Sequence, residues 1–250
     1  MIVSDPAFYA FAAPAVVLVG LSKSGFGTGF GALAVPLMAL TVPVPQAAAI
    51  LLPLLVVMDG FGLRALWHER ERRLLALLVP AGLLGIVIGF TLFSWLSARV
   101  VAGMVGGLTL AFLAVRVLRP PRADAPPPAR WLGRVLGVTS GFTSFVAHAG
   151  GPPIGFYVLP LKLPPVRFAA TMSVFFAAMN AAKWLPYAWL GLIDMTNMGT
   201  SLVLTPLALL GVWLGVRIVR VIPRALFYRL FNLGMLVTGS KLLWDGLSWR

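Results

Sequence analysis

Five ionisable side chains interrupt apolar segments of the sequence, where charge is costly. They are Lys23, Asp59, His148, Lys183 and Lys241, and a helix-end salt bridge with Asp245 is sufficient to explain Lys241. A charged residue at the centre of a membrane-spanning helix costs about 2.5–3.5 kcal/mol on insertion scales, so such a residue indicates a functional site. The lysines supply positive charge for an anion, and histidine exchanges a proton near neutral pH. These residue types predict anion binding, with His148 as the candidate for proton coupling.

The spacing of these residues narrows the site. Asn180 and Lys183 are three residues apart, which places both side chains on one face of a helix, so we expect them to act together. Structural interpretations stay open for two others: Lys23 can extend toward the membrane surface, and His148 can be hydrogen-bonded in a packed turn. Asp59 lies near the basic end of its apolar segment. We therefore interpret it as an interfacial residue and leave it outside the predicted site.

Two glycine-rich stretches, residues 22–36 and 139–153, lie about 120 positions apart. Glycine permits backbone conformations closed to other residues, and non-helical backbone survives at membrane depth only where it is buried in protein or lines a polar cavity. The alternative is that these glycines serve close helix packing. The predicted substrate-binding residues are Lys23, Ser24, Gly27, Thr28, Gly29, Gly31, His148, Gly150, Gly151, Asn180 and Lys183.

A helix interrupted by glycine exposes free N–H groups and the positive end of its dipole, and both suit an anion. Pro152 and Pro153, directly after Gly151, are typical of a helix start, because proline is tolerated in the first turn. We expect two such ends, one from each glycine-rich stretch, to meet near the middle of the membrane.

The elements that must position these residues are membrane helices. Hydrophobic residues make up 60% of the 250 positions, charged residues 11%, and the mean hydropathy is +0.95. Soluble domains average about 25% charged residues, so this chain requires lipid as a partner. The formal charge of +13 is concentrated in short loops, a pattern that sets membrane orientation rather than nucleic-acid binding.

Several functions are not expected from this composition. Without cysteine the chain has no disulfide or thiolate chemistry. His68, in a basic loop, is the only other histidine, so we expect no metal site. The serines lack a histidine and an acid in any plausible catalytic triad, and no phosphate-binding loop is present. We therefore expect neither enzymatic activity nor a cofactor.

The apolar segments form two similar sets. They span residues 7–22, 30–42, 46–66, 74–95 and 98–117, then residues 131–147, 152–161, 166–190, 198–216 and 226–247. A proline-rich linker over residues 119–130 separates a first membrane repeat (1–118) from a second (131–250). Residues 80–89 and 206–215 share one pattern of proline and glycine. Two halves built to one plan are typical of transporters.

The fold prediction is an all-α polytopic membrane protein. In each half, the two short segments form a glycine-rich hairpin and three transmembrane helices follow. Each half then makes an odd number of crossings, so the second half is inverted relative to the first. With the N-terminus outside, most lysines and arginines fall in cytoplasmic loops, including the linker, whereas Arg99 and Arg250 remain outside. We expect a bacterial inner-membrane protein with both termini outside, and homodimer formation stays open.

Residues 26–36 and 141–153 resemble the twin glycine-rich signatures of the sulfite exporter TauE/SafE family of membrane permeases, and the resemblance covers nearly the whole chain. It departs from the family pattern at Phe30, where a third consecutive glycine is usual. The resemblance implies secondary transport of sulfite, sulfonates or related organic anions.

We therefore predict a secondary permease for a small anion, with a sulfur-containing oxyanion or organosulfonate as the expected class. The alternative is a non-transporting membrane subunit or scaffold of a larger complex. A membrane enzyme would require clustered acids, histidines or a nucleophile, and a cation pathway would require several buried acids. The sequence shows neither pattern.

Overall fold

The structure is a computed structural model of the chain, and it describes residues 2–24, 33–93, 95, 97–118 and 127–248. Within these ranges every regular element is a helix, which confirms the all-α prediction. The helices are α1 (Pro6–Ser24), α2 (Ala34–Met38), α3 (Val44–Leu66), α4 (Arg72–Leu92), α5 (Ala98–Leu118), α6 (Arg130–Ala147), α7 (Gly151–Val158), α8 (Pro165–Trp189), α9 (Met195–Val221) and α10 (Arg224–Leu247). Two short 3₁₀ turns, η2 (Trp67–Glu69) and η3 (Leu159–Leu161), follow α3 and α7.

The helices follow the apolar segments closely, and prolines mark several of their starts. Pro43 and Pro164 occupy the N-cap positions of α3 and α8, and each helix has a further proline in its first turn. Proline fits there because its missing N–H would have no partner inside the helix. Among the described residues, four helices are long and apolar enough to cross a membrane by length and composition alone. Their ranges are Pro6–Lys23, Pro45–Glu69, Arg72–Leu92 and Met195–Val221.

The second apolar segment differs from its prediction. Of residues 30–42, the structure forms a helix only over Ala34–Met38, and residues 30–32 lie outside the described ranges. The chain then turns, with Thr41 donating its backbone N–H to the carbonyl of Met38. Val42 precedes a proline, and residues before proline disfavour the helical conformation. The helix therefore ends early, and the turn leads directly into α3.

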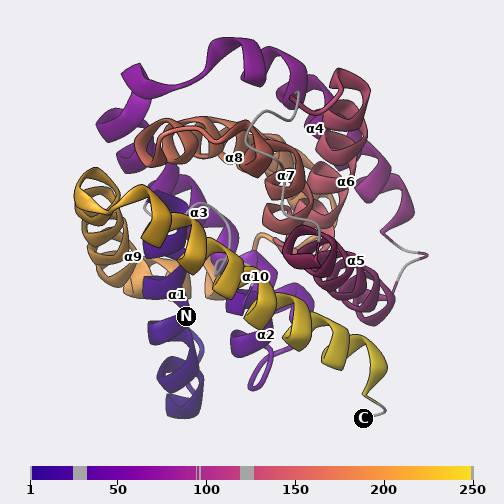
Figure 1. Cartoon of the computed structure of the whole chain (residues 1–250). Coiled ribbons are helices and arrows are strands. Elements are labelled where there is room, and N and C mark those ends of the chain that lie inside the picture. The colour runs from indigo at the N-terminus through magenta and orange to yellow at the C-terminus, as the bar shows by residue number, and fades with distance from the viewer. Residues whose placement is uncertain (1, 25–32, 94, 96, 119–126, 249–250) are drawn as a thin grey trace.

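The helices pack as a small set of antiparallel or crossing pairs (Figure 1). The most extensive pairs are α4 with α6, α5 with α10, and α1 with α9. Helices α3 and α8 contact each other, and they also contact α9 and α4 respectively. The short helices α2 and α7 pack against α1 and α6. The second glycine-rich stretch thus includes the turn that connects the long helix α6 to the short helix α7 beside it, whereas residues 25–32 of the first stretch lie outside the described ranges.

Facing glycines allow three of these pairs to approach closely. They are Gly20 and Gly211 between α1 and α9, Gly82 and Gly141 between α4 and α6, and Gly103 and Gly246 between α5 and α10. A Cβ atom added to Gly20 would lie 2.8 Å from the carbonyl carbon of Gly211, closer than real Cβ atoms come to other atoms. Small residues at such crossings are typical of membrane helices, because they let backbones make direct contact. These six glycines serve close helix packing, and Gly141 is the one among them that belongs to a glycine-rich stretch.

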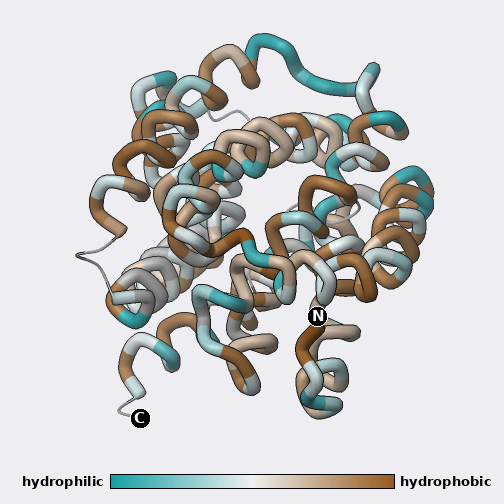
Figure 2. Tube along the Cα trace, turned by 180° about the vertical axis from the view of Figure 1, so that it is seen from behind, coloured by the Kyte–Doolittle hydropathy of each residue, from teal (hydrophilic) through white to brown (hydrophobic). Residues whose placement is uncertain are grey.

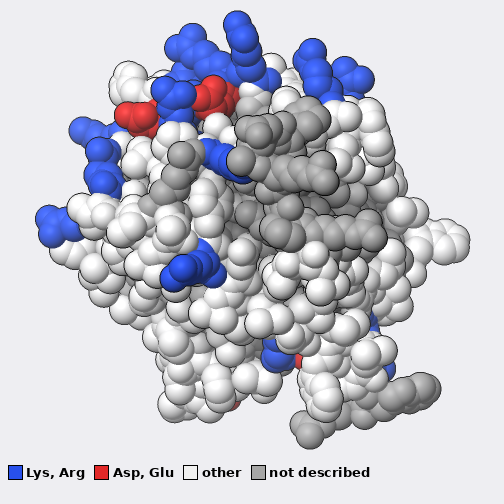
Figure 3. Space-filling view, viewed as in Figure 1, with Lys and Arg blue, Asp and Glu red and all other residues white. Residues whose placement is uncertain are grey.

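The surface fits a protein surrounded by lipid. Large apolar side chains face outward, for example Leu84 (54% exposed) and Val87 (56% exposed) on α4. Apolar segments recur along the helices, and a continuous hydrophilic stretch lies at the connection between α3 and α4 (Figure 2). Lysine and arginine side chains gather at that end of the molecule (Figure 3). This separation of apolar flanks from a basic end is typical of a multi-pass membrane protein.

Candidate functional site

A continuous group of polar side chains lies inside the helix bundle. Its members come from α1, α3, α8 and the turn between α6 and α7: Lys23, Asp59, His148, Asn180 and Lys183. We call these five residues the central network. Four of them are buried, with Lys183 completely inaccessible. The structure therefore brings together four residues that the sequence predicted for the site, and it adds Asp59.

Lys23 and Asp59 form a buried ion pair. The Lys23 Nζ atom lies 2.6 Å from Oδ1 of Asp59, and it also donates to the carbonyl oxygen of Leu55 at 2.8 Å. Leu55 and Asp59 are four residues apart on α3, so their acceptors lie on the same face of that helix. Only 9% of Lys23 is exposed, so it does not extend to the surface. The interfacial interpretation of Asp59 is corrected here, because this residue is 4% exposed and bonded to two predicted site residues.

Asn180 connects this ion pair to the second half of the chain. Its Nδ2 atom donates to Oδ2 of Asp59 at 2.8 Å, and its Oδ1 atom accepts a hydrogen bond from Nζ of Lys183 at 3.0 Å. The second bond confirms that positions 180 and 183 share a helix face. Asp59 and Asn180 also hold nearly equivalent positions in the two halves, 121 residues apart. That correspondence was the sequence signal that could have placed Asp59 in the site.

His148 lies in the turn between α6 and α7, in a left-handed backbone conformation with φ of 49°. This conformation is uncommon for residues other than glycine and needs local support. Ser140 supplies it by donating from Oγ to the carbonyl of Gly150 at 2.6 Å, and Thr143 accepts the backbone N–H of Ala149 on its carbonyl. The turn therefore holds the imidazole in a fixed direction, toward α3 and α8.

The contacts of His148 define where its proton lies. The Nε2 atom is 3.1 Å from the carbonyl oxygen of Ala48, and the Nδ1 atom is 2.9 Å from Nζ of Lys183. A carbonyl oxygen only accepts hydrogen bonds, so Nε2 carries a hydrogen. Nδ1 then accepts from a protonated Lys183, or donates to a neutral one. While this contact lasts, the two side chains together hold at most one positive charge, because only one hydrogen fits between the two nitrogens.

With both lysines protonated, the central network holds two positively charged groups and one negatively charged group. With His148 neutral, Lys23 and Lys183 face a single carboxylate, that of Asp59, among the described buried residues. Each ammonium has three N–H donors, and the described contacts use two on each lysine. An uncompensated charge in an apolar interior is strongly unfavourable. Among the described residues, the protonated Lys183 therefore has no carboxylate partner.

Other predicted site residues surround this network. Gly150 and Gly151 are buried at the turn, and α7 begins at Gly151 with two prolines following, as predicted. Those prolines lack N–H groups, so the start of α7 offers fewer donors than a typical helix N-terminus. An anion here would depend mainly on side chains. Outside the described residues lie Gly27, Thr28, Gly29 and Gly31, and the side chain of Ser24.

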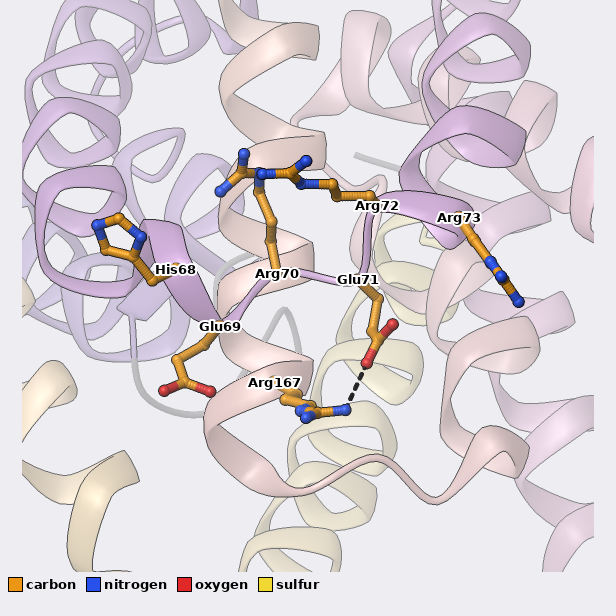
Figure 4. Close-up of a pocket in the computed structure, with 7 residues that line it drawn as sticks. All are labelled: His68, Glu69, Arg70, Glu71, Arg72, Arg73 and Arg167. Carbon is orange, nitrogen blue, oxygen red and sulfur yellow. Dashed lines mark hydrogen bonds and ion pairs between the residues drawn. The ribbon is translucent and has the colours of Figure 1, made fainter.

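A separate basic pocket of about 420 Å³ lies at the charged end of the molecule (Figure 4). It is lined by His68, Glu69, Arg70, Glu71, Arg72, Arg73 and Arg167. Arg167, in the first turn of α8, donates to Glu71 at 2.8 Å and so connects the start of α8 to the segment before α4. The pocket is lined by surface residues and does not include the central network. Its arginines raise the local concentration of anions near this end.

Apolar helices around a buried set of ionisable groups are the features of a polytopic membrane protein. The family model of the sulfite exporter TauE/SafE family matches residues 12–242. The chain belongs to this family, whose members are membrane permeases for sulfur-related anions rather than enzymes. The resemblance seen in the glycine-rich signatures is thereby confirmed. No curated protein and no solved structure is detectably similar to the chain.

Proposed function

We propose that this protein is a secondary permease for a small sulfur-containing oxyanion or organosulfonate, and that the anion binds at the central network. The observation that carries the proposal is the environment of Lys183. Its side chain is completely buried, and its hydrogen-bond partners among the described residues, His148 and Asn180, are uncharged in this arrangement. A protonated lysine in that position needs a counter-charge, and the bound substrate anion supplies it.

The proposed substrate contacts come from both halves of the chain. Sulfite and sulfonate groups carry several oxygens that accept hydrogen bonds, and the remaining N–H donors of Lys23, Lys183 and Asn180 suit them. Bonds between an ammonium and an oxyanion are charge-assisted and about twice as strong as neutral ones. Backbone at the two glycine-rich stretches, including Ser24, Gly27–Gly31, Gly150 and Gly151, is proposed to complete the site.

The proposal includes two inverted repeats, residues 1–118 and 131–250, joined by a cytoplasmic linker. Helix pairing supports it. Exchanging the halves replaces α1 to α5 by α6 to α10, so the pair α4 with α6 becomes α9 with α1, and α3 with α9 becomes α8 with α4. All four pairs are present, and the pairs α3 with α8 and α5 with α10 exchange with themselves. Transporters of this type move one repeat against the other around a central site.

Hydrogen bonds between the halves would change in that movement. The Asp59–Asn180 bond is one, and the bond from His148 to the carbonyl of Ala48 is another. A third joins Oγ of Ser173 to the carbonyl of Lys23 at 3.2 Å. All three lie at or beside the proposed anion, so binding and movement are coupled. We place the basic end in the cytoplasm of a bacterial cell and both termini outside the inner membrane, in accordance with the positive-inside rule.

Anion binding should raise the melting temperature of the purified protein. A ligand at about 100 times its Kd adds about 2.7 kcal/mol, which corresponds to about 5–10 °C for a chain of this size. We expect such a rise with at least one of sulfite, thiosulfate and isethionate, and a smaller one with acetate. Lys23→Ala should remove it, because Asp59 then cancels the remaining positive charge.

The control is Lys241→Ala, which removes a lysine paired with Asp245 on α10, away from the network. It should keep the ligand-induced rise. If none of the sulfur anions shifts the wild-type melting temperature, the permease proposal is contradicted and a membrane subunit without a substrate becomes the better account. An equal loss in both lysine variants would show that the effect comes from general charge and not from this site.

His148→Gln should uncouple proton movement from anion movement. Glutamine can donate to the carbonyl of Ala48 and accept from Lys183, as the neutral imidazole does, but it does not titrate. In proteoliposomes with an internal pH dye, we expect proton flux per transported anion to fall at least about tenfold. His68→Gln, in the basic pocket, is the matched control and should leave the flux unchanged. Unchanged proton flux in His148→Gln would assign the coupled proton to another group.

A further inference from the structure

We infer that Asp59 limits the central network to one negative charge from the substrate, so that this permease selects monovalent over divalent anions. The inference rests on the proposed function and deepens it by naming the charge class of the substrate. Membership of the family does not by itself assign Asp59 a role in selecting the charge of the substrate. It follows from the contacts and burial of the carboxylate within the network.

The ionisable groups that face Asp59 come from each neighbouring element. Lys23 on α1 contacts one carboxylate oxygen, and Asn180 on α8 contacts the other. Lys183 lies one hydrogen bond beyond Asn180, and His148 in the α6–α7 turn lies one beyond Lys183. Among the described buried residues, Lys23, Asp59 and Lys183 are the only lysines, arginines or acids. The charge of the site is therefore set by these few groups.

The maximum positive charge of the network is one. Lys183 and His148 share one hydrogen between Nζ and Nδ1 and contribute at most one positive charge. Lys23 contributes a second, and the carboxylate of Asp59 cancels one of the two. A monovalent anion therefore makes the occupied site neutral. A divalent anion leaves an excess negative charge in an apolar interior, which is strongly unfavourable.

Asp59 also occupies donors that a second anionic group would need. Its two oxygens accept from the Lys23 ammonium and from the Asn180 amide, at 2.6 and 2.8 Å. An oxyanion would use the same kinds of donor. The carboxylate thus acts as an internal anion of the protein, and it competes with any second negative group on the substrate. Asp59 is in this sense a residue that determines specificity.

The test compares two sulfonates with the same two-carbon length and different charge. Isethionate is monovalent and sulfoacetate is divalent at neutral pH. Titration calorimetry of the purified wild-type protein should give a Kd for isethionate at least about tenfold lower than for sulfoacetate, because like charges in a buried site repel strongly. Asp59→Asn keeps the size of the side chain and its contact with Asn180. It should reverse the preference, by about tenfold or more in favour of sulfoacetate.

A second pair of variants distinguishes an effect of the net charge of the network on binding from a loss of folding. Lys23→Met alone leaves the network neutral and should abolish isethionate binding, whereas Lys23→Met with Asp59→Asn restores one positive charge and should restore it. Asp245→Asn, at the lysine-paired carboxylate on α10, is the matched control and should keep the wild-type preference. If no variant binds either sulfonate, including the wild type, the proposed function itself fails.

Other outcomes overturn the inference and leave the permease proposal standing. One is a wild-type protein that binds both sulfonates equally. Another is an Asp59→Asn protein that binds with the wild-type preference. A third is a double variant that binds no isethionate although it melts cooperatively at the wild-type temperature. Each of these results would show that net charge at Asp59 does not set the substrate class.

Discussion

Replacing Lys183 by methionine should abolish anion binding and still leave the protein at least as stable to unfolding. The two effects separate because this lysine has no carboxylate among its described hydrogen-bond partners, His148 and Asn180. Truncating one member of a buried charged contact costs about 2–5 kcal/mol of binding, or roughly thirtyfold to several thousandfold in Kd. Methionine has similar length and volume and fills the same space.

The same substitution should leave the free energy of unfolding unchanged or raise it, although it weakens anion binding. Replacing buried ionic groups by apolar residues of similar volume is neutral or stabilises a protein by about 1–4 kcal/mol, because the cost of burying the charge disappears. We expect the melting temperature of Lys183→Met without ligand to equal or exceed that of the wild type. Lys23 differs, because it pairs with Asp59 and its removal leaves that buried carboxylate without a directly contacting cation.

Melting curves with and without isethionate measure both effects in one experiment. Lys241→Met is the matched control, since the Lys241 side chain is 33% exposed and lies on α10, away from the network. It should bind isethionate normally and melt close to the wild type, as surface ion pairs contribute little. A Lys183→Met protein that binds with wild-type affinity would place the anion elsewhere. One that unfolds at much lower temperature would show that Lys183 is a structural residue.

Most of the helices could be predicted from the sequence, because each corresponds to a long apolar segment and prolines or charged residues separate these segments. The pairing of Asn180 with Lys183 was predictable for the same reason: both positions lie on one helix, where spacing fixes geometry. The start of α7 at Gly151 followed from its prolines. Each of these features depends on residues that are close together in the sequence, so a local sequence pattern is enough to predict it.

The contacts between distant segments were harder to predict. Asp59 and Asn180 are 121 residues apart, and apart from their equivalent positions in the two halves the sequence does not distinguish a partner of Lys23 from a residue at the membrane surface. The left-handed turn at His148 and its bond to Ala48 depend on how α3, α6 and α7 pack. Tertiary packing decided each of these points.

Gly141→Val should destabilise the protein more than any substitution at the surface, because it separates the pair α4 and α6. A Cβ atom added to Gly141 would overlap the carbonyl oxygen of Gly82, which belongs to the backbone of α4. Rotating a side chain does not relieve such a collision, and the two helices must move apart. Overpacking costs typically about 1–3 kcal/mol, and we expect about 3 kcal/mol or more here.

Gly60→Val is the matched control, because Gly60 also lies inside a helix but an added Cβ meets no atom within 4 Å. It should change stability by about 0.5 kcal/mol or less. Thermal melting in detergent compares the two variants directly. Since α6 ends at the turn that holds His148, Gly141→Val should also weaken isethionate binding in the fraction that stays folded. Equal melting temperatures for the two variants would show that α4 and α6 are not in direct backbone contact.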